Sequence, residues 1–436
     1  MSDSSARGAA NAVTLIRDAR HWQTGERIER AFANGQVLER APAAPDRVIE
    51  AGGAILAPGL VDLHVHLREP GQTAKETIES GARAAAAGGF TSVACMPNTK
   101  PVLDSVAWIE WVRHRAEKAL CRVLPIAAVT VGQEGAQLTE FVALERAGAV
   151  ALSDDGRPIM NAGLMRHALE YAKQTRLPIV VHEEDLTLRG DGAMNEGLTA
   201  TRLGIRGIPA AAESVMVRRD VELAELTQGR VHFAHLSCKA SFDALRDGKA
   251  RGLRVSGETC PHYWMLTDEA VADYDTRAKM NPPLRSDLDR EATVEAIADG
   301  TIDCFVTDHA PHTEDEKRQP FDQAPFGIVG LETALALTIA GLVRPGHLSL
   351  SRALELWTEA PRRVFGLPEV SIEPGSPADL VLFDPELEWT VDASRFASRG
   401  RNTPFDGWRL SGRVLATFCG GQQTFALEGA PAETRA

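Results

Sequence analysis

The sequence predicts an α/β fold, a TIM-type (β/α)8 barrel that carries a small β-sandwich domain made from both ends of the chain. Eight apolar runs of strand length recur along the chain, and helical segments separate many of them. This alternation, over roughly 300 residues, implies parallel strands joined by crossover helices. The two flanks lack the alternation and contain short β-like pieces instead. A doubly wound open sheet is the alternative arrangement of the same elements.

The predicted strands and helices follow one another as a barrel requires. The strands are Gly59–His64, Thr91–Met96, Val123–Val129, Ala149–Leu152, Pro178–His182, Val231–His235, Leu253–Glu258 and Asp303–Thr307. Between them, Lys75–Ala87 is rich in alanine and stops at a Gly-Gly pair, a helix C-cap signal. Met165–Lys173 and Ala211–Leu226 are further predicted helices, the second with apolar residues at helical spacing. Eight such units predict a closed barrel.

The flanks are predicted to meet in one small domain. The β-like pieces AVTLIRDAR and RVIEAGGAILA lie before the barrel, and ADLVLFDP and GRVLATFCGGQQTF lie after it. Turn signals such as Gly420-Gly421 punctuate the second group. Because chain termini often lie close together in space, we assign residues 1–57 and 372–436 to the β domain and residues 58–371 to the barrel.

The amino-acid composition limits the kinds of molecule that this protein can bind as its main partner. The formal net charge of −13 over 436 residues argues against nucleic acid or an anionic membrane surface as the main partner. No apolar segment is long enough to span a membrane, and the polar N-terminus has no signal-peptide pattern. The six cysteines are scattered singly without a CxxC pair, which predicts free thiols in a reducing cytoplasm. A small anionic substrate is still compatible, because a cationic pocket can lie within an acidic protein.

Ionisable side chains stand at or just after the ends of several predicted strands. They are His64, His66, Asp154, Asp155, His182, His235 and Asp308. In a barrel these strand ends converge on the face where active sites lie. A single His or Asp at a strand end is ordinarily a hydrogen-bonded polar residue or a helix cap. The same explanation at every one of these positions would be an improbable coincidence. Nitrogen and carboxylate donors without thiolates suit zinc, and six of them suit two ions that share a bridge.

The alternation in His64-Val65-His66 strengthens the metal interpretation. Residues i and i+2 of a strand face the same way, so both imidazoles can bind one ion. His232 lies on the body of a strand and is interpreted as an ordinary structural residue outside the ligand set. His262 follows the seventh strand and is left outside the predicted ligand set.

The motifs HVHLREPG, MPNT, SDDG, ETCPHYWMLTD, KMNPPLR and TDHAPH together resemble those of the class I dihydroorotases, a branch of the metal-dependent amidohydrolases. The resemblance runs from about Leu56 to Phe365. It implies the reversible cyclisation of N-carbamoyl-L-aspartate to L-dihydroorotate in de novo pyrimidine (UMP) biosynthesis. Hydantoinase, dihydropyrimidinase or allantoinase activity is the first alternative. A non-catalytic partner subunit of aspartate transcarbamoylase is the second, although such subunits have lost ligands that this chain retains.

The resemblance implies a ligand set and a mechanism. His64, His66 and Asp308 bind a first zinc ion, His182 and His235 a second, with one or two ions per chain. Many relatives bridge the ions with a carbamylated lysine, but no lysine occurs between Lys118 and Lys173. An aspartate is then the bridge, and the alignment of SDDG favours Asp155 over Asp154. Metal-bound hydroxide attacks the ring amide, with Asp308 as general base and then general acid.

The implied substrate contacts are His66, Leu67, Arg68, Asn98, Asn281, His312, Phe326 and Gly327. Arg68 can hold the α-carboxylate of the substrate in a two-pronged pair, with a surface salt bridge as the alternative. Asn98 is either an amide donor to the substrate or a turn residue. Residues 313–325 are either a lid over the site or a solvated loop. The resemblance further implies a homodimer or a complex with aspartate transcarbamoylase.

Overall fold

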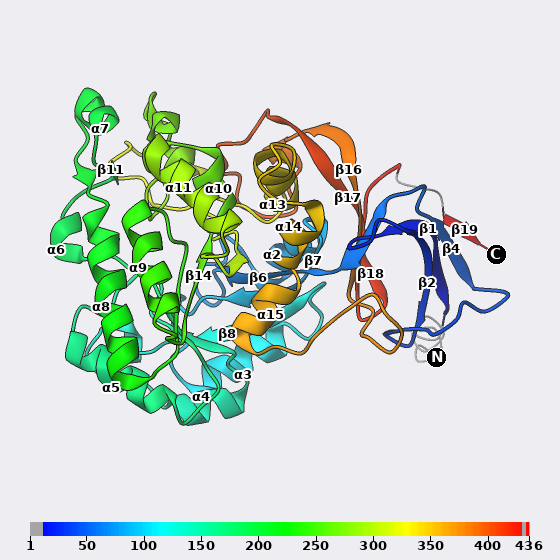
Figure 1. Cartoon of the computed structure of the whole chain (residues 1–436), viewed down its shortest axis with the longest axis horizontal. Helices are drawn as coiled ribbons and strands as arrows, with labels where there is room; N and C mark the ends of the chain where they lie inside the picture. The colour runs from blue at the N-terminus through cyan, green and yellow to red at the C-terminus, as the bar shows by residue number, and fades with distance from the viewer. Residues whose placement is uncertain (1–11, 430–432, 436) are drawn as a thin grey trace.

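The computed structural model describes residues 12–429 and 433–435, and its centre is an eight-stranded parallel sheet (Figure 1). Its order, β15-β14-β13-β10-β9-β8-β7-β6, follows the chain without the reversal of a doubly wound sheet. The strands are β6 (Leu60–Val65), β7 (Phe90–Cys95), β8 (Arg122–Ala127), β9 (Ala151–Ser153), β10 (Ile179–Val181), β13 (Val231–Phe233), β14 (Val255–Thr259) and β15 (Cys304–Phe305). All eight predicted strands are therefore confirmed.

The chain that follows β15 closes the barrel against β6. Val65 and His309 form a parallel bridge, and the backbone N–H of His66 donates to the carbonyl of His309 at 2.8 Å. The buried carboxylate of Asp62 accepts hydrogen bonds from the backbone N–H of Thr307 at 3.2 Å. The TIM-type prediction is confirmed, because the first and last strands meet.

Helices cover the outside of the barrel, and the three predicted ones are confirmed as α2, α5 and α8. The N-terminus of α2 is a capping box in which Thr77 and Ser80 exchange side-chain and backbone hydrogen bonds. Its C-cap is Gly88, where an added Cβ would lie 2.1 Å from the carbonyl oxygen of Leu331. The larger helices are α2 (Ile78–Ala87), α3 (Val106–Arg115), α4 (Phe141–Ala147), α5 (Ala162–Ala172), α8 (Ala211–Thr227), α9 (Lys239–Ala250) and α11 (Asp287–Ala298).

Shorter elements occupy the loops and the last part of the barrel. The short helices are α6 (Leu186–Arg189), α7 (Leu198–Leu203), α10 (Pro261–Met265), α12 (Glu314–Lys317), α13 (Ala334–Thr338), α14 (Leu350–Glu355) and α15 (Glu359–Phe365). A two-stranded pair joins β11 (Met194–Asn195) to β12 (Gly207–Ile208). Among the described residues, none of the helices has the length and apolar character needed to cross a membrane.

Strands from both flanks join in one nine-stranded sheet at the side of the barrel (Figure 1). They are β1 (Thr14–His21), β2 (Arg27–Ala33), β3 (Gln36–Val37), β4 (Arg47–Glu50), β5 (Ile55–Pro58), β16 (Leu380–Thr390), β17 (Arg409–Cys419), β18 (Gln422–Ala426) and β19 (Glu433–Arg435). The antiparallel pair β5–β16 joins the two ends of the chain. Phe32 on β2 and Phe418 on β17 are not in neighbouring strands, yet their ring centroids lie 5.1 Å apart. The sheet therefore folds over on itself, as a sandwich does.

The β domain and the barrel are joined by specific contacts. The hydroxyl of Thr417 on β17 donates to the carbonyl of Ala86 at the end of α2, at 2.7 Å. The amide of Asn402 donates to the carbonyls of Ala310 at 3.1 Å and Gly327 at 3.0 Å, both at the barrel mouth. Part of the segment assigned to the β domain thus supports the barrel. The division at residues 57 and 372 stays a prediction.

Candidate active site

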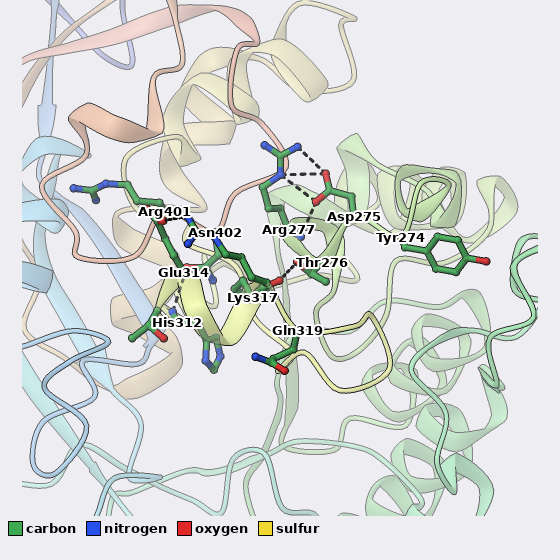
Figure 2. Close-up of a pocket in the computed structure, with 12 residues that line it drawn as sticks. Tyr274, Asp275, Thr276, Arg277, His312, Glu314, Lys317, Gln319, Arg401 and Asn402 are labelled. Atoms are coloured by element: carbon green, nitrogen blue, oxygen red, sulfur yellow. Dashed lines mark hydrogen bonds and ion pairs between the residues drawn. The ribbon is translucent and has the colours of Figure 1, made fainter.

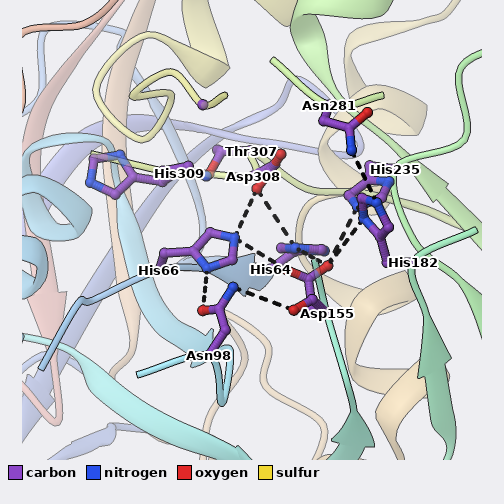
Figure 3. A network of polar contacts seen from close by, with 12 residues as sticks. His64, His66, Asn98, Asp155, His182, His235, Asn281, Thr307, Asp308 and His309 are labelled. Atoms are coloured by element: carbon purple, nitrogen blue, oxygen red, sulfur yellow. Dashed lines mark hydrogen bonds and ion pairs between the residues drawn. The ribbon is translucent and has the colours of Figure 1, made fainter. Parts of the chain in front are cut away.

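The six predicted metal ligands converge at one end of the barrel, and all are buried. They are His64, His66, Asp155, His182, His235 and Asp308. Figure 3 shows their side chains pointing toward one another from different strands. The Nε2 atom of His66 lies 3.1 Å from Oδ1 of Asp308, and the Nε2 atom of His64 lies 3.6 Å from the same oxygen. The alternation expected for β6 does bring both imidazoles to one point.

Asp155 lies between the two groups of histidines. Its Oδ1 atom is 3.3 Å from Nε2 of His64, 3.5 Å from Nε2 of His235 and 3.7 Å from Nδ1 of His182. Its Oδ2 atom is 3.5 Å from Nε2 of His66. This placement fits a carboxylate that is shared between two ions.

Asp154 is directed away from this cluster. Its Oδ1 atom accepts the backbone N–H groups of Val129 at 2.9 Å and Thr130 at 3.0 Å, and its other oxygen accepts the hydroxyl of Thr130. It therefore fixes the loop after β8. Of the two aspartates in SDDG, only Asp155 has the geometry of a ligand.

The donor atoms fit a divalent cation. The Nε2 atom of His64 and the Oδ1 atom of Asp155 are buried and have no hydrogen-bond partner among the described residues. Two sets of three donor atoms lie within 4.8 Å of one another: His64 with His66 and Asp308, and His64 with Asp155 and His235. Buried polar atoms are rarely left without a partner unless a water or an ion satisfies them. Imidazole and carboxylate donors with this spacing match zinc or a similar ion.

The charges at the site also favour a cation. Burial alone would raise the pKa of Asp155, but the nearby imidazoles of His64, His182 and His235 hold it well below its usual range. Burial likewise opposes the ionisation of Asp308, yet the hydrogen bond from His66 and the charge of His64 lower its pKa to about 2. Both carboxylates are ionised at neutral pH, so a divalent ion would find compensating charge.

A cavity of about 220 Å³ opens beside these ligands. Its lining residues are His66, Arg68, Asn98, Asp155, Gly156, His182, Arg189, His235, Asn281, Asp308, Ala310, His312, Phe326 and Gly327. Every predicted substrate contact except Leu67 is among them. The side chain of Leu67 is buried and points at Gly81 of α2, where an added Cβ would lie 2.4 Å from it.

A larger cavity of about 490 Å³ lies next to α12, and His312 and Asn402 are among the residues that line it (Figure 2). His312 also lines the first cavity, and Asn402 binds the backbone of Gly327 there. None of the six predicted metal ligands lines it. Its charged groups have partners already: Arg277 pairs with Asp275 at 2.9 Å, and the ammonium of Lys317 binds backbone carbonyls. The smaller cavity is therefore the candidate active site.

Arg68 enters the cavity as a buried guanidinium. Its Nε atom donates to the carbonyl of Pro311 at 3.2 Å, and it has no carboxylate partner among the described residues. The salt-bridge alternative is wrong, because Glu69 instead pairs with Arg115 at 3.1 Å and accepts the N–H of Ile78 at the start of α2. Burial lowers the pKa of Arg68 to about 10, so it remains charged at neutral pH. A buried cation without an anion beside it is a site for one.

Asn98 and Asn281 orient two of the imidazoles. The Oδ1 atom of Asn98 lies 2.9 Å from Nδ1 of His66, which leaves Nε2 of that ring free toward Asp308. The amide of Asn281 lies 3.3 Å from Nε2 of His182, whose Nδ1 atom faces Nε2 of His235 at 3.0 Å and Oδ1 of Asp155 at 3.7 Å. Asn98 therefore does more than occupy a turn.

The predicted lid is anchored at both ends. The Lys317 side chain is buried, and its ammonium donates to the carbonyls of Pro325 at 2.9 Å and Gly327 at 3.0 Å. Phe321 is buried, and its carbonyl accepts a hydrogen bond from the ammonium of Lys279 at 2.6 Å. These contacts anchor the segment at Lys317 and Phe321, while Glu314, Arg318 and Asp322 are among its exposed residues. Whether residues 313–325 form a lid or a solvated loop stays a prediction.

Arg189 and Asn402 have no signal in the sequence patterns, and Glu258 was expected only as the end of a predicted strand, without a role in the site. Arg189, on the short helix α6, lines the cavity, with its guanidinium carbon 5.3 Å from the centre of the Phe326 ring. Its Nε atom is buried without a hydrogen-bond partner, although a carboxylate oxygen of Glu184 lies 3.6 Å away. Asn402 supports the mouth from the far end of the chain, and Glu258 binds His64 from below. Each depends on contacts between distant segments.

Comparison with known proteins agrees with this site. A family model described as dihydro-orotase-like matches residues 53–241. The dihydroorotase of Syntrophotalea carbinolica is 50% identical over 414 residues, which cover 95% of this chain and 94% of that protein. The dihydroorotase of Pelotomaculum thermopropionicum is 53% identical over 86% of this chain and 88% of its own length.

Solved structures agree on the fold. The L-hydantoinase (dihydropyrimidinase) from Arthrobacter aurescens superposes with a TM-score of 0.85 and covers 96% of this chain, at 24% sequence identity. A D-hydantoinase structure superposes with a TM-score of 0.83 at 23% identity. At such low identity the likeness establishes only the fold, and the relatives of about 50% identity establish the family. The chain belongs to the dihydroorotase family.

Proposed function

We propose that this protein is a dihydroorotase, which interconverts N-carbamoyl-L-aspartate and L-dihydroorotate in pyrimidine biosynthesis. The observation that carries the proposal is the buried guanidinium of Arg68, which has no carboxylate partner and lies in the same small cavity as five of the six candidate ligands. A substrate with a cyclic amide and a carboxylate satisfies both features at once. Relatives named dihydroorotase that align over most of the chain support the same activity.

We propose zinc as the ion, with one or two bound per chain. His64, His66 and Asp308 would hold the first ion, His182 and His235 the second, and Asp155 would lie between them. Bound there, zinc lowers the pKa of a water molecule to about 7 and polarises the carbonyl of the substrate. Elemental analysis of the purified protein measures both the identity and the number of ions.

Asp308 is the proposed general base and acid. It lines the cavity, and hydrogen bonding to His66 keeps it ionised, so it can accept a proton at neutral pH. In the hydrolytic direction it takes the proton of the attacking water and then delivers it to the ring nitrogen that leaves. One carboxylate serves both steps because the proton moves at a single centre.

The remaining groups hold the substrate in place. Arg68 binds the α-carboxylate in a charge-assisted pair. Burial and the positive charges of Arg68 and Lys75 lower the pKa of His312, so this ring is neutral and bonds the carbonyl of Phe326 at 2.8 Å. That contact positions the Phe326-Gly327 backbone beside the ring of the substrate. Asn281 contributes an amide donor at the opposite wall.

The alternative activities predict different substrates. Hydantoins and dihydropyrimidines have a neutral ring, which gives a buried arginine nothing to pair with. A non-catalytic subunit has no need for six converging ligands, and all six are in place here. A homodimer, a complex with aspartate transcarbamoylase and a cytoplasmic location are further proposals that the family resemblance supports. Five of the six cysteines are buried free thiols, in keeping with a reducing compartment.

The test is an assay of zinc-loaded protein with dihydroorotate, carbamoyl aspartate and hydantoin in parallel. We expect turnover of the first two and little turnover of hydantoin. Turnover of hydantoin without turnover of dihydroorotate would overturn the proposal in favour of the neutral-ring alternative. Absence of any turnover with metal bound would favour the non-catalytic subunit.

A further inference from the structure

A chain of buried hydrogen bonds continues from His64 into the interior of the barrel, away from the cavity. The Nδ1 atom of His64 lies 2.8 Å from Oε1 of Glu258, on β14. The other oxygen of Glu258 lies 2.9 Å from Nε2 of His232, on β13. The Nδ1 atom of His232 lies 2.8 Å from the hydroxyl of Ser256. His64, His232 and Glu258 are fully buried, so water does not compete for these bonds.

The strand register builds this chain. His232 on β13 is the direct partner of Ser256 on β14 in their parallel pairing. Glu258 is two residues further along β14, so it faces the same side as Ser256. The carboxylate therefore reaches the space between the imidazoles of His232 and His64. His232 is therefore a buried residue with a hydrogen-bond partner at each ring nitrogen.

The hydrogen bonds fix which ring nitrogens carry protons. An ionised carboxylate only accepts hydrogen bonds, so both imidazoles must donate to Glu258. Each oxygen of Glu258 has one imidazole nitrogen as its partner, at 2.8 Å for His64 and 2.9 Å for His232. With an ion bound, His64 would keep its proton on Nδ1 and present a lone pair on Nε2, the atom that faces Asp155 and Asp308. His232 carries its proton on Nε2 and accepts the hydroxyl of Ser256.

We propose that Glu258, held by His232, is a positioning residue that fixes the orientation and tautomer of His64 and so sets the affinity of the first metal position. The inference rests on the metal centre of the proposed function. A carboxylate that accepts the N–H of a metal-binding imidazole also increases the basicity of the other ring nitrogen, which then binds the metal more strongly.

A rival interpretation is a separate metal site, because His232, Glu258 and Cys304 bring donor atoms within 4.8 Å of one another. Both oxygens of Glu258 are already used by imidazole N–H groups. Burial raises the pKa of the Cys304 thiol well above its usual value, so it stays protonated and is a poor ligand. The cluster therefore supports His64 rather than binding an ion itself.

The test is zinc affinity, measured on purified full-length variants by competition with a chelator. We expect Glu258→Leu to bind the first ion about 10- to 100-fold more weakly than the wild type. Glu258→Gln should lose less, because its amide oxygen can still accept from His64 while its N–H₂ donates to the other tautomer of His232. Cys304→Ala is the matched control inside the cluster and should retain wild-type affinity and stoichiometry.

His232 gives a second, milder pair of variants. His232→Gln keeps an N–H that can donate to Glu258 and should stay within about threefold of wild-type affinity, whereas His232→Leu should lose about tenfold. Circular dichroism and the thermal midpoint show whether each variant folds. The visible absorption of the cobalt-substituted proteins reports the ligand field without any assay of turnover.

The outcomes separate this inference from the proposed function. Folded Glu258→Leu and His232→Leu proteins with wild-type zinc affinity would overturn the inference while leaving dihydroorotase activity intact. Loss of one ion per chain in Cys304→Ala would overturn it in favour of the separate site. Metal binding without turnover of dihydroorotate in the wild type would instead overturn the proposed function and leave the role of Glu258 standing.

Discussion

Two buried aspartates at opposite ends of the barrel differ in what surrounds them. Asp379, at the floor, has both oxygens bound by Arg122, at 2.9 and 3.1 Å, and also accepts the N–H of Gly420. Asp155, at the mouth, is equally buried, but its Oδ1 atom has no hydrogen-bond partner among the described residues. The charge of Asp379 is therefore balanced by Arg122 within the chain, whereas Asp155 keeps an oxygen that a ligand can bind. This difference distinguishes a structural carboxylate from a functional one.

The largest expected effect comes from the mouth. Asp308→Asn should lower kcat by about a thousandfold or more, because the amide can neither accept the proton of water nor return it. The bond to His66 can persist through the amide oxygen, so the fold should be retained. Steady-state hydrolysis of dihydroorotate and the thermal midpoint measure the two effects. More than a tenth of wild-type kcat in this variant would exclude Asp308 as the proton carrier.

Arg68→Gln tests the anion site at the same end. Loss of a charge-assisted pair, roughly 1.5–3 kcal/mol, predicts a 10- to 100-fold fall in kcat/KM for dihydroorotate. Zinc content should not change, because Arg68 contacts none of the ligands through a hydrogen bond among the described residues. An unchanged KM for both dihydroorotate and carbamoyl aspartate would show that the carboxylate binds elsewhere.

A change at Asp379 should lower the stability of the protein without lowering its kcat. Asp379→Asn leaves the Arg122 guanidinium, about half exposed, without its carboxylate and should lower the free energy of unfolding by about 1–3 kcal/mol. Urea denaturation measures this loss, and kcat for dihydroorotate should stay within about twofold. Asp155→Asn is the matched variant at the mouth and should reverse the pattern. An Asp379→Asn protein with normal stability and a low kcat would contradict the assignment of Asp379 as a structural carboxylate.

A carboxylate near the β domain gives a pH dependence of stability. Burial raises the pKa of Glu332 to about 7, even though it accepts the N–H groups of Ala397 and Ser398. Because the folded pKa lies above the unfolded value, its contribution is fully present below pH 4.5 and is lost as the pH rises through 7. Glu332 lines an open cavity, so the effect should be only about 1–2 kcal/mol. Glu332→Gln should flatten the unfolding free energy between pH 5 and 7, and an unaltered slope would contradict this assignment.

The smallest expected effect is at Arg189. Its guanidinium is partly neutralised by Glu184 and partly exposed, so Arg189→Gln should raise KM by only about three- to tenfold. The kcat value should change little, because Arg189 contacts none of the predicted metal ligands by a hydrogen bond among the described residues. Equal kinetics for the variant and the wild type would limit the anion site to Arg68.

The sequence alone predicted those parts of the site that depend on the geometry of single strands. His64 and His66 followed from strand alternation, and the strand ends converge because all eight strands are parallel. Glu258 could not be predicted as a support of His64, because their contact depends on the curvature that brings β14 close to β6. Asn402 reaches the mouth from a position 92 residues beyond Ala310, with no periodicity to mark it. Leu67 was expected at the substrate, but it is its neighbours His66 and Arg68 that line the cavity, and its own side chain packs on α2.

The central claim is that the unsatisfied atoms at the barrel mouth form a metal centre beside a carboxylate clamp. The most direct measurement removes the metal with a chelator and then titrates zinc back while recording both bound zinc per chain and turnover of dihydroorotate. We predict that turnover is absent without metal and rises in step with the first one or two ions bound. Full turnover by the metal-free protein would contradict the account.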